Sequence, residues 1–130
     1  MPASKIEVLL EELKHISALI DSPLQKGDIP SLLIELDAVS CWLARSAEIV
    51  ADAVQINMDD RKVAMENLVE GTSATKARDI VNGMCSQTER LRVLAERMNA
   101  ALTHRIDAIR SIISAEKALA QVGAYSGGHA

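Results

Sequence analysis

Apolar residues recur at intervals of three and four along most of the chain, and this spacing predicts helices rather than strands. A first helix is expected over residues 4–21. Ser4 and Glu7 form a capping box at its start, and Pro23 disfavours helical geometry just before it. The chain therefore opens with a helix of about five turns.

The apolar pattern resumes after a polar loop and predicts helices over residues 30–57 and 59–70. Asp28 is the expected N-cap, and Pro30 fits the first helical turn. The signal weakens between the two segments, which are interpreted either as one continuous helix or as two helices with a short kink. Gly71 then fits a left-handed helix end and a tight turn.

Residues 73–120 contain no proline and only one glycine, Gly83, and they predict a single helix roughly 70 Å long. The apolar pattern keeps its phase through Gly83, so we expect the helix to pass through it. Residues 123–130 are rich in turn formers and predict a disordered tail. Residues 1–122 are expected to form a single helical domain.

These elements predict an all-α fold built on an antiparallel hairpin with a very long C-terminal helix. A fold about Gly71 places Leu36 near Ile106 and Val50 near Arg92. The N-terminal helix is long enough to cover only part of this hairpin, so we expect a three-helix bundle at the end distant from Gly71.

The rest of the hairpin would then carry an apolar seam that no other part of the chain covers. Exposed apolar seams usually mark interfaces, and a symmetric homo-oligomer is the simplest way to complete the bundle. The expected interface residues are Val54, Met58, Met65, Leu68, Ile80 and Met84.

Composition and charge refine this expectation. The chain has no Phe, one Trp and one Tyr, which suits closely packed helices with small and branched side chains. Residues 1–72 carry thirteen acids and six bases, whereas residues 73–130 carry five acids and eight bases. This asymmetry indicates attraction between the early helices and the long one, or a basic face for an anionic partner.

The candidates for such a basic face lie on the long helix. Arg90, Arg97 and His104 are seven residues apart and form one line, with Arg105 beside it. The line could follow a phosphate backbone or hold a small anion, or it could be an ordinary face of solvated and paired charges.

Asn99 and Thr103 lie four residues apart beside the apolar seam of the same helix. They predict either a buried polar layer that fixes the register or a solvated helix edge.

No motif in the sequence indicates a catalytic site. His15 and His104 are isolated from other metal-ligand residues, and the chain has no glycine-rich phosphate loop. Cys41 and Cys85 fall within apolar helices, where cysteine acts as a small hydrophobe. We therefore expect a non-enzymatic protein without metal or cofactor.

We expect a cytoplasmic protein with no membrane partner. The two cysteines are isolated, and the sequence shows neither an export segment nor a long apolar run.

Three strings resemble small helical proteins of bacteriophages and prophages that are often encoded near replication and recombination genes. The strings are Trp42-Leu43-Ala44-Arg45-Ser46-Ala47-Glu48, Ser73-Ala74-Thr75-Lys76, and Leu94-Ala95-Glu96-Arg97-Met98-Asn99 with the following Leu102-Thr103-His104-Arg105-Ile106-Asp107. The resemblance implies a phage accessory role and assigns no catalytic residue.

Three functions follow as hypotheses. The first is an oligomeric helical interaction protein that binds a host or phage protein as an accessory or anti-defence factor. The second is a nucleic-acid accessory protein that uses the basic line of the long helix. The third is a protein that sequesters an anionic nucleotide at a subunit interface.

Overall fold

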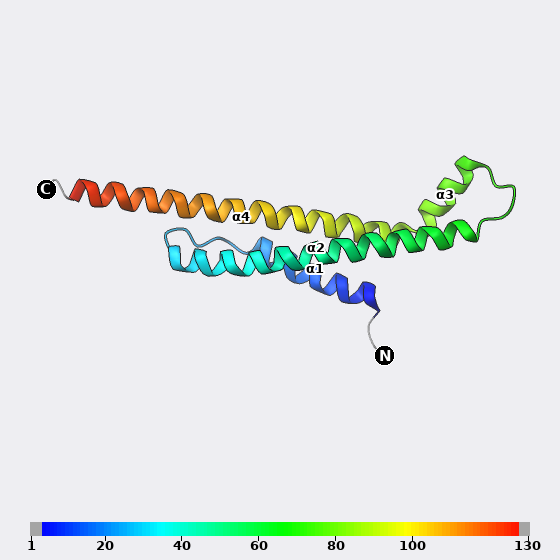
Figure 1. Ribbon diagram of the computed structural model, residues 1–130, viewed down its shortest axis with the longest axis horizontal. Coiled ribbons are helices and arrows are strands. Elements are labelled where there is room, and N and C mark those ends of the chain that lie inside the picture. Colours follow the sequence, from blue (N-terminus) through cyan, green and yellow to red (C-terminus); the bar gives the residue numbers. More distant parts are fainter. Residues whose placement is uncertain (1–3, 128–130) are drawn as a thin grey trace.

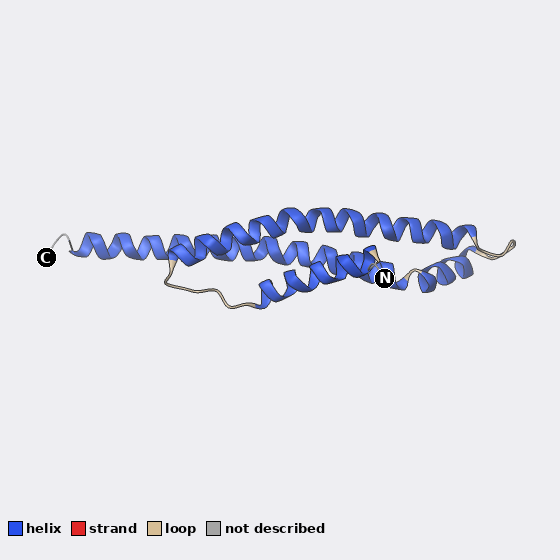
Figure 2. Ribbon diagram, turned by 90° about the horizontal axis from the view of Figure 1, so that it is seen from below, coloured by secondary structure: helices blue, strands red, loops and turns tan. Residues whose placement is uncertain are grey.

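The computed structural model describes residues 4–127, and within that range the fold consists of four helices and no strand. Two long helices, α2 (Ile29–Glu66) and α4 (Ser86–Gly127), run antiparallel along the molecule (Figure 1). The shorter helices α1 (Lys5–Asp21) and α3 (Ala74–Met84) pack at different places along this pair (Figures 1 and 2). The all-α prediction and the antiparallel hairpin are confirmed.

The predicted caps set the first two helix starts. Ser4 Oγ accepts from the Glu7 N–H at 3.2 Å, and Glu7 Oε2 accepts from the Ser4 N–H at 3.2 Å, which completes the capping box of α1. Asp28 Oδ1 accepts from the Ser31 N–H at 3.2 Å at the start of α2. Hydrogen bonds from Ser31 lower the pKa of the Asp28 carboxyl, because they favour its charged form.

Helix α2 is continuous through the two aspartates at which the sequence pattern weakens, so the one-helix interpretation of residues 30–57 and 59–70 is correct. It ends at Glu66, four residues earlier than predicted. Gly71 has a φ of +86°, as expected of a left-handed glycine, but it lies in the loop after the Asn67 C-cap. A seven-residue connection, residues 67–73, replaces the predicted tight turn.

The predicted single helix over residues 73–120 is wrong, because it is divided at Cys85 into α3 and α4. Cys85 has φ −102° and ψ 13°, away from helical values. Gly83 lowers helix propensity next to the break, and the Thr88 hydroxyl of α4 bonds to Asp60 of α2 at 2.7 Å, so contacts between helices hold the start of α4 in place. As a result α3 leaves the axis of α4 (Figure 1).

Helix α4 continues to Gly127, so the prediction of a disordered tail is wrong for residues 123–127. Residues 128–130 of that predicted tail lie outside the described residues.

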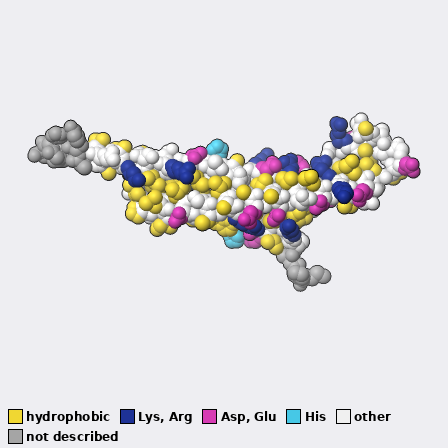
Figure 3. All heavy atoms as spheres, viewed as in Figure 1, with side chains coloured by type: hydrophobic (Ala, Val, Ile, Leu, Met, Phe, Trp, Pro, Cys, Tyr) yellow, Lys and Arg dark blue, Asp and Glu magenta, His cyan; other side chains and the backbone are white. Residues whose placement is uncertain are grey.

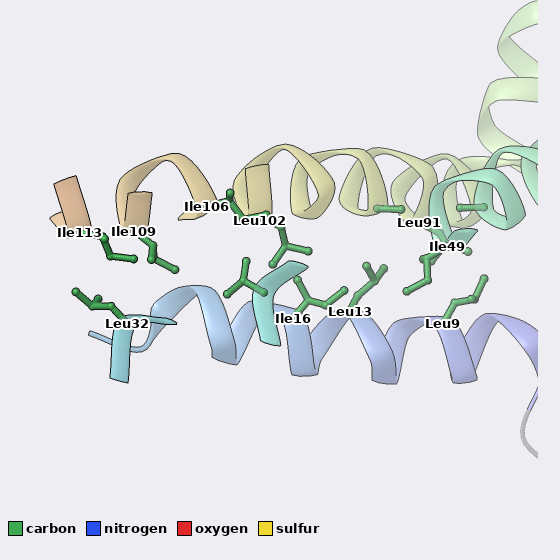
Figure 4. Close-up of a cluster of buried hydrophobic side chains, with 13 residues drawn as sticks. Leu9, Leu13, Ile16, Leu32, Ile49, Leu91, Leu102, Ile106, Ile109 and Ile113 are labelled. Atoms are coloured by element: carbon green, nitrogen blue, oxygen red, sulfur yellow. The ribbon is translucent and has the colours of Figure 1, made fainter. Parts of the chain in front are cut away.

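The core lies where α1 covers the α2–α4 pair, as the three-helix bundle prediction required (Figure 4). Each helix contributes residues whose separations are three, four or sums of such steps, so they lie on one side of the helix. The buried members are Leu9, Leu13 and Ile16 of α1, Leu32, Val39, Ile49 and Ala53 of α2, and Leu91, Ala95, Leu102, Ile106, Ile109 and Ile113 of α4.

Two hydrogen bonds between side chains define the register of α2 against α4. Asn57 bonds to Thr88, and Asn99 bonds to Ser46. In both pairs the residue numbers add up to 145, whereas a fold about Gly71 pairs residues whose numbers add up to 142. The predicted pairing of Leu36 with Ile106 and of Val50 with Arg92 is therefore displaced by about one helical turn.

Candidate interaction site

The end of the molecule formed by the last part of α2 and by α3 carries the exposed apolar residues predicted as an interface. We call this end the tip. Met58, Met65 and Met84 have exposed fractions of 58%, 63% and 60%, and Ile80 is 38% exposed. We call Met58 and Met65, which line one hollow on α2, the tip face. Figure 3 shows hydrophobic side chains at this end, with Lys and Arg side chains beside them.

The two other predicted interface residues, Val54 and Leu68, are half-buried. Leu68 packs against a small second core made of Ala64, Val81 and Cys85. This core holds α3 against α2, so the tip is partly filled from within the same chain. The residues of the tip face remain uncovered among the described residues.

A hollow separates α2 from α3 beside the tip face. Its lining is mainly apolar with two arginines, and consists of Arg61, Met65, Leu68, Ala74, Ala77, Arg78, Val81 and Asn82. The tilt of α3 at Cys85 opens this space. The tip thus offers both an exposed apolar surface and a recess next to it.

Buried polar groups connect the tip to the rest of the α2–α4 pair. Thr88, 6% exposed, donates to Asp60 Oδ2 at 2.7 Å, and the Asn57 amide donates to Thr88 Oγ1 at 3.1 Å. Turning the Asn57 amide over would instead let its nitrogen donate to Glu89 Oε2 at 3.1 Å. Either orientation keeps Asn57 in the cluster, which fixes the register at the base of the tip.

Arginines extend this polar cluster to the surface. Arg61 donates to Asn82 Oδ1 of α3 at 3.1 Å and lies 3.5 Å from Glu89 Oε2 of α4. Arg92 also bonds to Glu89, and hydrogen bonding to Arg92 is the main cause of a lowered pKa of the Glu89 carboxyl. Burial raises the pKa of the Cys85 thiol, and the nearby Asp60 charge adds to the effect, so this cysteine is held as a neutral thiol.

Sequence reasoning missed this polar cluster. One signal was present: Asn57 occupies a seam position of α2, in line with the buried Ala53 and Ala64. A polar residue at a seam position needs a partner, because an unpaired buried amide is costly. The partner itself, Thr88, could be identified only from the correct helix register.

The basic line predicted on α4 is only partly present. Arg90, Arg97 and His104 are exposed, and neither arginine takes part in an ion pair among residues 4–127. Arg105 is 8% exposed and cannot belong to a binding face.

Arg105 binds other parts of its own chain. Its guanidinium pairs with Glu35 and donates to the carbonyl oxygens of Ile20 at 2.7 Å and Ser22 at 2.8 Å. It therefore ties α4 to α2 and to the end of α1. Seven-residue spacing placed Arg90, Arg97 and His104 on one side, whereas Arg105 points toward the neighbouring helices.

Asn99 forms a polar layer, but Thr103 is not its partner. The Asn99 amide donates to Ser46 Oγ of α2 at 2.7 Å, and Ser46 is buried. Thr103 is exposed and bonds to the backbone carbonyl of Asn99 at 3.2 Å. Asn99 therefore belongs to the predicted polar layer, whereas Thr103 lies on a solvated helix edge.

The remaining candidates are the two cysteines and His15. Cys85 is buried as expected, but Cys41 is exposed, so the prediction that it fills an apolar contact is wrong. The His15 ring stacks on Trp42 with centroids 6.5 Å apart. Among residues 4–127, no three His, Cys, Asp or Glu side chains gather as metal ligands would.

No family model matches the chain, and comparisons with curated proteins and with solved structures find no match either. Within residues 4–127, no helix has a stretch both long and apolar enough to span a bilayer.

Proposed function

We propose that this chain is a non-enzymatic helical interaction protein that assembles with itself and acts by binding another protein through the tip face. The observation that carries the proposal is the exposure of Met58 and Met65, which line one hollow on α2. Contiguous apolar patches on folded proteins commonly mark binding sites. Methionine suits such a site, because its flexible, polarizable side chain adapts to different partner surfaces.

The base of the tip supports the same function. The Asn57–Thr88–Asp60 hydrogen bonds and the second core of Ala64, Val81 and Cys85 hold α2 and α3 in place. A surface ordered before binding loses less entropy when a partner docks. The ordered tip and the resemblance to phage helical proteins together favour an accessory or anti-defence role.

The test uses two double variants on one face of α2. Residues 44, 51, 58 and 65 are spaced by seven, and all four are exposed, but the first two are alanines and the last two methionines. Met58→Glu/Met65→Glu places charges in the tip face, whereas Ala44→Glu/Ala51→Glu places the same charges on the bundle. Affinity purification from the natural host, followed by binding measurements with the purified partner, compares both with wild type.

We expect the methionine variant to lose the partner at least tenfold and the alanine variant to retain it. Equal binding by both variants would contradict a role for the tip face.

A DNA-binding function is the second candidate, because Arg90 and Arg97 are exposed on one line and take part in no ion pair among residues 4–127. Binding to a single-stranded or duplex oligonucleotide should then weaken with salt. Arg90→Ala/Arg97→Ala should reduce the slope of log affinity against log salt by about 2. Arg110→Ala, a change at another exposed arginine of α4, is the control. Absence of binding by wild-type protein at low salt would eliminate this candidate.

A further inference from the structure

The last part of α4 extends past every other helix of the described chain (Figures 1 and 2). In the α2–α4 register, Ile29, the first residue of α2, lies opposite Glu116. Residues 117–127 therefore have no part of α2 beside them, and residues 117–123 are all exposed. We call residues 114–127 the α4 tail.

This tail has an apolar stripe that differs from the seam in the core. The core seam of α4 runs through Leu102, Ile106, Ile109 and Ile113 and ends there. A second line then follows strict steps of four and three on another side of the helix. Its members are Ala108, Ile112, Ala115, Leu119 and Val122; we call them the tail seam.

The tail seam is largely uncovered within the chain. Leu119 and Val122 are 68% and 62% exposed, Ala108 and Ala115 are exposed, and only Ile112 is half-buried. Most helical stability in proteins comes from packing of an amphipathic face, not from intrinsic propensity. The tail has such a face, and within the described chain only its member Ile112 packs against the core.

We propose that the tail seam pairs with the tail seam of a second copy, antiparallel and about a two-fold axis near Lys117. Steps of four and three are the spacing with which two helices interlock their side chains. In this arrangement Ile112 lies opposite Val122 of the second copy, and Ala115 lies opposite Leu119. The first contact joins two bulky side chains, and the second joins a small side chain to a bulky one. Each contact occurs twice, as a two-fold axis requires.

Charge complementarity also favours a second copy as the occupant. Residues 111–123 contain one acid, Glu116, and one base, Lys117, so two copies bring no net like charge together. Ser111, Ala118 and Gly123 flank the seam and allow the two helices to approach closely. The antiparallel orientation also places the two bundles at opposite ends of the contact, where they do not collide.

This inference rests on the self-assembly proposed above and assigns it to a surface at the opposite end from the tip face. The test is the mass of the full-length protein in solution, measured by light scattering during gel filtration over a concentration series. Wild type should give twice the chain mass of 14.0 kDa at micromolar concentration.

Two double variants isolate the seam. Leu119→Glu/Val122→Glu puts two charges in it, whereas Ser114→Glu/Gln121→Glu puts two charges on the other side of the same segment. The seam variant should be a monomer with at least a hundredfold weaker association, and the control should remain a dimer. Thermal unfolding of both variants verifies that the bundle, whose core ends before these positions, is folded.

Orientation is tested by disulfide formation in a Cys41→Ser background. The antiparallel pairing predicts that Ala115→Cys and Leu119→Cys chains form few disulfides alone and a cross-linked heterodimer when mixed. Efficient cross-linking of either chain alone would overturn this pairing.

A wild-type monomer throughout the concentration range would overturn both self-assembly and the tail contact. A seam variant that remains dimeric while Met58→Glu/Met65→Glu becomes monomeric would overturn the tail contact alone, because assembly would then use the tip.

Discussion

Arg105 shows how one buried charge can organise a helical bundle. Its side chain is 8% exposed and that of its partner Glu35 is 19% exposed. The same guanidinium satisfies the carbonyl oxygens of Ile20 and Ser22, where α1 ends and no longer supplies helical partners. One side chain therefore positions three elements.

Arg105→Ala should lower the free energy of unfolding by about 3 kcal/mol, because it leaves Glu35 without its partner and two carbonyl groups without a donor. Urea unfolding followed by circular dichroism measures the change. Arg97→Ala, at an exposed position of the same helix, should stay within about 0.5 kcal/mol of wild type. Equal effects of the two substitutions would contradict a structural role for Arg105.

Glu89 makes stability depend on pH. Its pKa in the folded protein lies below the ordinary value of 4.5, chiefly because Arg92 donates to the carboxylate. A carboxyl with a lowered folded pKa stabilises the protein above its unfolded pKa. That stabilisation is lost as the pH falls from about 4.5 through the folded pKa.

We therefore expect the urea midpoint to fall as the pH is lowered below about 4.5, and Glu89→Gln to fall less over the same range. Glu11→Gln is the matched control, because Glu11 lies on the exposed surface of α1 and its ion pair with Lys14 is long at 3.8 Å. An identical pH dependence of wild type and Glu89→Gln would show that this ion pair contributes nothing.

At the scale of single elements, Gly71, in the loop before α3, and Gly83, inside α3, should respond to alanine in opposite ways. Gly83 lies in the helix, and nothing comes within 4 Å of a Cβ built there. Gly83→Ala should raise the free energy of unfolding by about 0.5–1 kcal/mol through better helix propensity. Gly71 has a φ of +86°, so Gly71→Ala should lower it by about 1 kcal/mol.

Thermal unfolding of both variants measures these changes. If Gly83→Ala were destabilising, the break at Cys85 would depend on a glycine near it. If Gly71→Ala were neutral, the loop would readily adopt another conformation.

The helix termini that the sequence predicts best are those with a cap. Ser4, Asp28 and Ser73 all accept from the backbone N–H three residues later, so local chemistry alone locates these starts. The break at Cys85 has no such local signal. It depends on Thr88 and Asp60 meeting across two helices, and on Val81 and Cys85 packing onto Ala64. Apolar spacing continues through the break and therefore cannot reveal it.

The register of the hairpin illustrates the same limit. A displacement of three residues is close to one turn of α-helix, so the apolar face of α4 still points inward. This is why the core residues of the three-helix bundle follow the predicted pattern although the pairs across it are displaced. The connection between α2 and α3 is centred on residue 70 and would alone give pairs adding up to 140, so the displacement comes from the tilt of α3 and the break at Cys85, which no apolar pattern specifies.

For the whole molecule, exposed apolar surface was predictable where chain geometry leaves a helix uncovered. The tip face follows from the shortness of α1, which the sequence shows directly. The tail seam was not predicted, because its members fall almost wholly within the predicted helix over residues 73–120, and apolar spacing does not show that α2 begins only opposite Glu116. Arg105 was assigned to the surface for a related reason: spacing identifies the side of a helix but not which neighbour covers it.

Self-pairing of the α4 tail would also couple folding to protein concentration. When only folded chains associate, a tenfold increase in concentration above the dimer Kd stabilises each chain by about 0.7 kcal/mol. This is half of the free energy that the same increase adds per dimer, because two chains share it. For a chain of this size that corresponds to a rise of about 2–4 °C in Tm.

Calorimetry across two decades of concentration should show this rise for wild type and for Ser114→Glu/Gln121→Glu. Leu119→Glu/Val122→Glu should unfold at one temperature throughout, because its bundle is intact but cannot associate. A concentration-independent Tm for wild type well above the dimer Kd would mean that the tail contact does not stabilise the fold.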